Sequence, residues 1–250
     1  MIEERPSFRD VFGAFTFYFF AQLLLIPVAA QVAHRVYAGQ WTGAVEWVGS
    51  SAVRPWINLM MVAILFMTIT VYTFRIEKGS LKQIWGKFLT PASLPLKALG
   101  YWCLAYPCLL IISNMSHSLL SRWITFPVVD QIAVQQVRLS QSDPVLYMLT
   151  ALSIVTLVPF VEEVLFRGFL QQYLKNHLSV FASVVVTAVV FAFFHFSMEQ
   201  GWTNVELIAA LFTFSLFLGY IREKSQSLNG SILLHGIFNG MSLLFMSLQQ

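Results

Sequence analysis

The chain has 250 residues, of which 57% are hydrophobic and 11% charged, and its mean hydropathy is +0.69. A soluble domain carries about 25% charged residues, so this composition excludes an ordinary soluble domain and indicates an integral membrane protein. The net charge of +3 is small, so no nucleic-acid partner is expected. The expected partner is the lipid bilayer.

Seven apolar stretches are candidates for transmembrane helices, because a helix needs ~20 mostly apolar residues to cross a bilayer. We therefore predict an all-α, polytopic membrane protein with about seven transmembrane helices and a polar site inside the helix bundle. The seven stretches are Val11–Ala33, Pro55–Phe74, Leu96–Met115, Pro144–Leu170, Leu178–Phe196, Val205–Tyr220 and Ser231–Leu248.

The chain divides into two predicted parts. Residues 1–142 hold three helices and an amphipathic, basic segment, Arg75–Leu89, which we interpret as an interfacial helix. Residues 143–250 hold the remaining four helices. A short surface helix is predicted over Val128–Val137, and Asp143 before a proline marks the start of the fourth transmembrane helix.

Lysine and arginine predict the orientation, since they are enriched in cytoplasmic loops. With Arg167 set aside, a cytoplasmic N-terminus places ten basic residues on the cytoplasmic side and four on the other. We predict a cytoplasmic N-terminus in a bacterial inner (cell) membrane. Six tryptophans flank the predicted helices as an interfacial belt would: Trp41, Trp47, Trp56, Trp85, Trp123 and Trp202.

Three charged side chains interrupt the fourth apolar stretch. A charged group costs ~2.5–3.5 kcal/mol at the centre of a transmembrane helix, so this cluster needs a reason. Glu163 and Arg167 are i,i+4 neighbours that can pair, and a structural ion pair is the simplest role for them. Glu162 points about 100° away and has no basic partner on its own helix. Glu162 is therefore the functional candidate.

Two later helices carry further polar groups at i,i+4 spacing. Phe191 shares a helix face with His195, and packing is the simplest role of Phe191; His235 shares a face with Asn239. Helical rise places Glu162 and His195 at similar distances, ~22–27 Å, from the turn near residue 177. We expect Glu162, His195, His235 and Asn239 to meet in one buried pocket.

Such a pocket suits hydrolysis. Glu162 and His195 can hold and deprotonate a water molecule, while His235 and Asn239 can donate hydrogen bonds to the oxyanion of an attacked carbonyl. Pro159, three residues before Glu162, is expected to kink the helix there.

At these residues the sequence resembles the CPBP family of intramembrane endopeptidases, which includes type II CAAX prenyl endopeptidases and bacterial proteins tied to bacteriocin processing or immunity. The pattern of that family is EExxxR, then FxxxH, then HxxxN, and all three are present here in order. The resemblance covers roughly Asp143 to Leu248. It implies a glutamic peptidase without a metal or other cofactor, acting on a peptide or membrane-protein substrate by CAAX-type or leader-peptide processing.

Carried over by the resemblance, Glu162 is the base and His195 its partner, and His235 with Asn239 forms the oxyanion hole. Glu163 and Arg167 would orient the site. Members of the family have also been labelled metalloproteases, and the alternative here is zinc at Glu162, His195 and His235.

Other functions stay open at this point. A non-catalytic membrane adaptor or immunity factor could use the same fold, and a small transporter could relay protons through Glu162 and His195. Single groups also have ordinary alternatives: His195 as a core histidine, or His235 and Asn239 as links between helices. Glu206 and His117 are expected to be solvated or interfacial.

Overall fold

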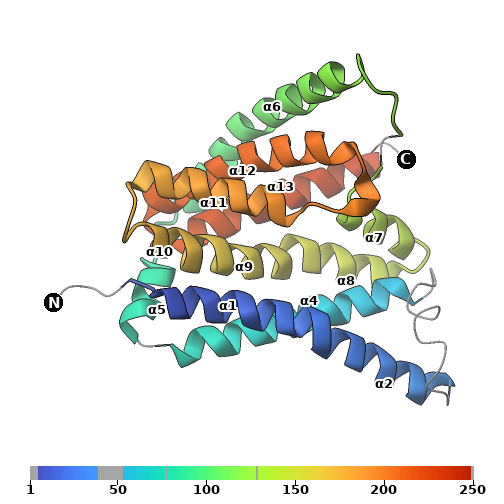
Figure 1. Cartoon of the computed structure of the whole chain (residues 1–250), viewed down its shortest axis with the longest axis horizontal. Helices are drawn as coiled ribbons and strands as arrows, with labels where there is room; N and C mark the ends of the chain where they lie inside the picture. The colour runs from blue at the N-terminus through green and yellow to red at the C-terminus, as the bar shows by residue number, and fades with distance from the viewer. Residues whose placement is uncertain (1–4, 39–52, 77, 128, 249–250) are drawn as a thin grey trace.

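The computed structural model describes residues 5–38, 53–76, 78–127 and 129–248, which form a bundle of helices (Figure 1). Within these described residues, six helices are long and apolar enough to cross a membrane, judged by length and composition, and they confirm the predicted polytopic helical fold. These six spans are Phe8–Val36, Arg54–Arg75, Leu94–Leu120, Pro144–Leu174, Thr203–Ser225 and Leu228–Leu248.

The first span combines α1 (Phe8–Phe20), a π-helical turn η1 (Ala21–Leu25) and α2 (Ile26–Ala38). It is followed by α4 (Arg54–Arg75), α5 (Lys78–Trp85), α6 (Leu94–Leu120) and α7 (Ile132–Ser140). The surface helix predicted over Val128–Val137 corresponds to α7, which begins at Ile132; Val128 lies outside the described residues. Of the predicted interfacial tryptophans, Trp41 and Trp47 lie outside the described residues.

The fourth predicted helix is interrupted rather than continuous. It begins as predicted, because Oδ1 of Asp143 accepts hydrogen bonds from the backbone N–H groups of Val145 and Leu146. Thr156 breaks it with φ −120° and ψ −60°, and a π-helical segment follows Glu163. Its pieces are α8 (Pro144–Val155), α9 (Leu157–Glu163), η2 (Val164–Leu170) and α10 (Gln171–Leu174).

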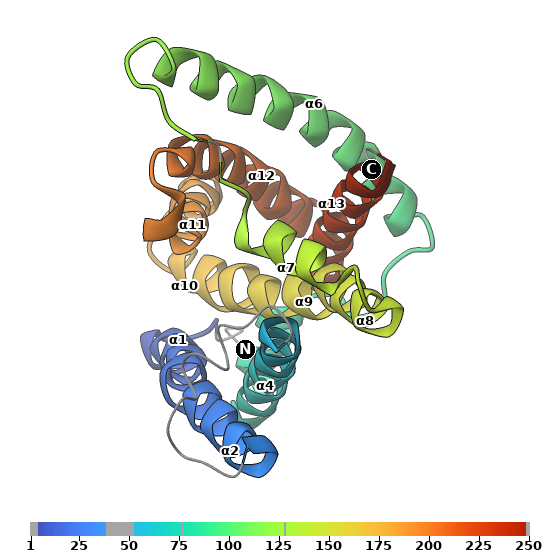
Figure 2. The ribbon, with the colours of Figure 1, turned by 90° about the vertical axis from the view of Figure 1, so that its right-hand side faces the viewer.

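The remaining helices complete the bundle. The fifth predicted span is α11 (Val180–Phe194), which has only 15 residues and is shorter than the ~20 that a full crossing needs. A short 3-10 turn, η3 (Met198–Gln200), leads into α12 (Thr203–Ser225), and α13 (Leu228–Leu248) follows. Viewed along the bundle, α6 lies at one edge, α1 and α4 lie at the other, and α9 runs between α4 and α13 (Figure 2).

The predicted interfacial segment Arg75–Leu89 contains α5, which packs against the bundle. Ile84 is fully buried and belongs to the main core, and the carbonyls of Gln83 and Ile84 accept hydrogen bonds from Nη2 of Arg222. The helix α5 therefore covers the end of η2, while Phe88 beyond it is 72% exposed. The interfacial role of this segment stays a prediction.

The main hydrophobic core joins the two predicted parts of the chain. It includes Ala14 and Ile69 from the N-terminal part and Phe166, Phe169 and Phe191 from the C-terminal part, all fully buried. The N-terminal helices therefore pack directly against the helix that carries the charged cluster. The proposed division at residue 143 stays a prediction about the chain's organisation.

The break at Thr156 leaves a carbonyl that α13 approaches closely. Pro159 has no N–H, so the carbonyl of Val155 lacks its usual partner four residues on. A Cβ atom added to Gly236 would lie 2.7 Å from this carbonyl oxygen. At Gly240, one turn further along α13, an added Cβ would lie 3.7 Å from the nearest atom, which is ordinary contact.

We expect Gly236→Ala to lower the free energy of unfolding by about 1–3 kcal/mol, because the backbone of α8 has to shift. Gly240→Ala is the matched control: it has the same gain in helix propensity, and we expect it to change stability by no more than about 0.5 kcal/mol. Denaturant unfolding of both variants in detergent measures the difference. Equal effects would contradict the close approach of α13 to Val155.

Candidate active site

A cavity of about 540 Å³ lies between α6, α7, α8, α9, α11, α12, α13 and the segment before α7. Most of its lining is apolar, and its polar groups outside the predicted site include Asp130, Gln131, Thr203 and Glu206. Five of the predicted site residues line it: Glu162, Phe191, His195, His235 and Asn239. The structure therefore brings together the side chains that the sequence placed in one pocket.

Glu162 lies between two imidazoles. Its Oε1 atom is 3.6 Å from Nε2 of His195, and its Oε2 atom is 3.8 Å from Nε2 of His235. These separations exceed a direct hydrogen bond of 2.7–3.2 Å but suit a water molecule held between the groups. The side chain of Glu162 is 15% exposed, so the carboxylate is sheltered but reachable from the cavity.

The other ring nitrogen of each histidine is anchored. Nδ1 of His195 lies 2.8 Å from the carbonyl oxygen of Phe191, and Nδ1 of His235 lies 2.9 Å from Oε1 of Glu163. Both partners are acceptors, so Nδ1 carries the hydrogen and Nε2 faces Glu162. Phe191 thus supports the site through its backbone as well as through packing.

Glu163 and Arg167 form the predicted pair, with Nη1 of Arg167 donating to Oε1 of Glu163 at 3.0 Å and both side chains fully buried. The guanidinium also donates through Nη2 to Ser215 of α12, and it lies 4.6 Å from the centre of the Phe191 ring. One continuous chain of polar contacts therefore runs from Arg167 through Glu163 and His235 to Glu162.

Asn239 has a second role that the sequence did not reveal. Its Nδ2 atom donates to the carbonyl oxygen of Ile154, next to the break in the fourth helix, at 2.9 Å. One amide N–H is used there, which leaves the other for a group inside the cavity. The break and the polar site are therefore connected through Asn239.

Sequence reasoning also missed groups around the site. Ser215, a partner of Arg167, was detectable as a polar residue within an apolar helix. Glu206 and His117 were expected to be solvated or interfacial, and the structure adds a contact between them: the side chain of Glu206 is 13% exposed, lines the cavity and meets Nδ1 of His117 at 2.6 Å. Tertiary packing of α6 against α12 pairs these residues, which are 89 positions apart.

Within the described part of the chain, no group of three or more His, Cys, Asp or Glu side chains is arranged to hold a metal ion. The alternative of zinc at Glu162, His195 and His235 remains a prediction for experiment, since both imidazole Nε2 atoms face one carboxylate.

Comparison with protein families gives one match. Residues 144–241 match the model described as "Type II CAAX prenyl endopeptidase Rce1-like". All seven predicted site residues lie within this range, whereas residues 1–143 lie outside it. Comparisons with curated proteins and with solved structures found no match. Together with the apolar helices, the match shows that residues 144–241 of this multi-pass membrane protein are similar to the Rce1-like family of type II CAAX prenyl endopeptidases.

Proposed function

We propose that the protein is an intramembrane endopeptidase in which Glu162 and His195 activate a water molecule. The observation that carries the proposal is the placement of one sheltered carboxylate between two anchored imidazoles, inside a cavity within a segment that matches a peptidase family. With Nδ1–H held by Phe191, a neutral His195 presents a lone pair at Nε2. A water donating one hydrogen to Glu162 and the other to His195 satisfies both acceptors.

In this mechanism Glu162 takes the proton of the attacking water and later delivers a proton to the leaving amine. The attacked carbonyl develops negative charge that needs donors. The free N–H of Asn239 supplies one. His235 supplies a second from Nε2 only as the imidazolium, because its Nδ1–H is already directed at Glu163. Glu163 and Arg167 act as positioning residues, since they hold His235 in place.

The chemistry is tested with protein purified in detergent and an unbiased peptide library read out by mass spectrometry. Wild type is compared with Glu162→Gln, each with and without a strong chelator. We expect wild-type cleavage that the chelator leaves unchanged and the variant lacks. Cleavage abolished by the chelator and restored by zinc would replace the water-activation proposal with the zinc alternative at Glu162, His195 and His235. The cleaved sequences would distinguish CAAX-type from leader-peptide substrates.

The non-catalytic adaptor is the second candidate, because residues 1–143 lie outside the family match yet share one core with the site. A phenotype in cells separates the two functions. Glu162→Gln preserves shape and removes only the negative charge, so an adaptor keeps its phenotype and an endopeptidase loses it. Protein levels in the membrane are measured alongside, so that loss of folding is not mistaken for loss of activity.

A further inference from the structure

In the part of the chain that the structure describes, the cavity is open at one end of the bundle. Thr203 and Glu206, at the start of α12, and Asp130 and Gln131, before α7, line its outer part. Phe214 lies eleven residues into α12, ~16 Å deeper by helical rise, and its ring is 5.3 Å from that of His235. The cavity therefore leads from the α7 end of the bundle to the polar site, about halfway along α12.

The short helix α11 explains this opening. Its 15 residues rise ~22 Å, which is less than the ~30 Å hydrocarbon core of a bilayer, and it ends beside His195. The space beyond this end is bordered by the segment before α7, which is fastened to α12. The hydroxyl of Thr203 accepts from the N–H of Val129 and donates to the carbonyl of Pro127.

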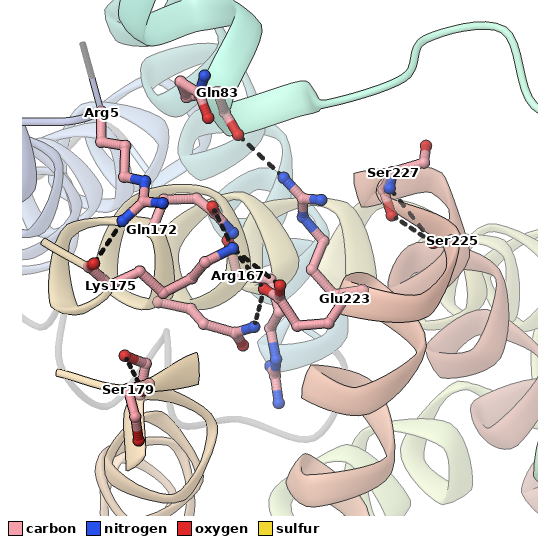
Figure 3. A network of polar contacts seen from close by, with 12 residues as sticks. Arg5, Gln83, Arg167, Gln172, Lys175, Ser179, Glu223, Ser225 and Ser227 are labelled. Atoms are coloured by element: carbon pink, nitrogen blue, oxygen red, sulfur yellow. Dashed lines mark hydrogen bonds and ion pairs between the residues drawn. The ribbon is translucent and has the colours of Figure 1, made fainter. Parts of the chain in front are cut away.

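The opposite end of the bundle is closed by packing. Below the polar site lie Phe166, Arg167 and Phe169, which are fully buried, and α5 covers them. A polar network seals the outermost layer: Lys175 pairs with Glu223 at 2.8 Å, Gln171 donates to Glu223, and Arg5 donates to the carbonyl of Lys175 (Figure 3). A pocket of about 390 Å³ at this end is lined by Lys82, Lys175, Arg222 and Glu223, but Glu162 and its histidine neighbours do not line it.

Basic residues identify which end faces the cytoplasm. The closed end carries ten of them and the open end four, and cytoplasmic loops are the ones enriched in Lys and Arg. At the closed end are Arg5, Arg9, Arg75, Lys78, Lys82, Lys87, Lys97, Lys175, Arg222 and Lys224. At the open end are Arg35, Arg54, Arg122 and Arg138.

We infer that the cavity opens to the non-cytoplasmic side of the membrane, so that the substrate is a peptide segment exposed there: part of an exported chain or of a membrane protein. This inference rests on the proposed endopeptidase function for the substrate, but the side on which the cavity opens follows from packing and charge alone. A segment that reaches Glu162 has to enter at the α7 end and descend between the apolar side chains of α12 and α13.

Cysteine labelling tests the side of the opening. Cys103 and Cys108, both exposed on α6, are first replaced by alanine. Gln131→Cys then places a thiol at the mouth, where Gln131 is exposed and its side chain caps no helix; His177→Cys places the matched thiol at the exposed turn of the closed end. In intact cells a membrane-impermeant maleimide should label Gln131→Cys, and His177→Cys only after permeabilisation. Labelling of His177→Cys in intact cells, or none of Gln131→Cys, overturns the inference.

Vesicles of known orientation test the substrate. A cleavable peptide from the library is added outside sealed right-side-out or inverted vesicles that hold the wild-type protein, with Glu162→Gln as the inactive control. We expect cleavage with right-side-out vesicles and loss of cleavage with inverted ones; the opposite result overturns the inference. No cleavage in either orientation counts against the peptidase, whereas the labelling result still decides the side on which the cavity opens.

Discussion

Glu162→Gln is expected to lower the rate of peptide hydrolysis by about 10²–10⁴-fold, the usual contribution of a positioned general base. The amide fills the same space between His195 and His235 but cannot take a proton from water. The rate constant kcat, measured in detergent on a peptide that the wild type cleaves, is the quantity to compare. The free energy of unfolding of the variant should change little, because the side chain of residue 162 faces the cavity and the amide has the same shape as the carboxylate.

Glu199→Gln is the matched control for this prediction. Glu199 lies four residues beyond His195 in the η3 turn, is exposed and does not line the cavity. The same removal of one negative charge there should leave kcat within a factor of about two, since a single distant surface charge is largely screened. Equal losses in both variants would mean that the protein responds to net charge and not to a base at Glu162.

Arg167→Met is expected to destabilise the protein by about 3–5 kcal/mol, because it leaves the fully buried carboxylate of Glu163 without its ionic partner. The variant also loses the hydrogen bonds to Ser215 and the contact with the Phe191 ring. Unfolding in mixed detergent, followed by circular dichroism, measures the change. His235 should be displaced as well, so activity falls even in the folded fraction.

Arg138→Met is the control for the ion pair. Nε of Arg138 lies 3.1 Å from Asp130, a distance close to that of the buried pair, but the two side chains are 58% and 44% exposed. Water and salt screen such a pair, so its loss should cost no more than about 1 kcal/mol. If both arginine variants lose the same stability, burial is not the reason that Arg167 matters.

A double variant, Glu163→Gln with Arg167→Met, separates the charge from the packing. Removing both charges abolishes the unpaired carboxylate, so part of the stability lost in Arg167→Met should return, as non-additivity of neighbouring sites predicts. Activity should not return with it, because His235 loses the carboxylate that anchors its Nδ1 atom. Recovery of both properties would contradict the positioning role of Glu163.

The charged and polar residues of the site were predictable because a polar side chain inside an apolar helix has a high free-energy cost. Glu162, Glu163, Arg167, His195, His235 and Asn239 stand in apolar stretches long enough to be membrane helices, and a polar group at that depth needs a partner or a function. The i,i+4 pairing of Glu163 with Arg167 is local geometry and was confirmed at 3.0 Å. Depth counted along the helices also brought Glu162 and His195 together correctly.

Contacts between helices were not predictable in the same way. Three such contacts join residues that are 48 to 85 positions apart in the chain. They are Glu163 with His235, Ser215 with Arg167, and Asn239 with the carbonyl of Ile154. Hydrophobic periodicity says which side of a helix is apolar but not which neighbour covers it. The same gap applies to α5, whose amphipathic pattern does not say which part of the bundle it contacts; the tertiary structure places it against η2.

The sequence by itself determined that this is a helical, multi-pass membrane protein with one polar centre, because in lipid every backbone group must be satisfied internally and every buried charge must be justified. Only the tertiary structure decided how that centre is built and reached. The break at Thr156, the short α11 and the α5 cap over η2 close the bundle at one end and leave the cavity open at the other. Those features depend on how helices pack against one another. Packing is a property of a pair of helices, so it cannot be read from one stretch of sequence alone.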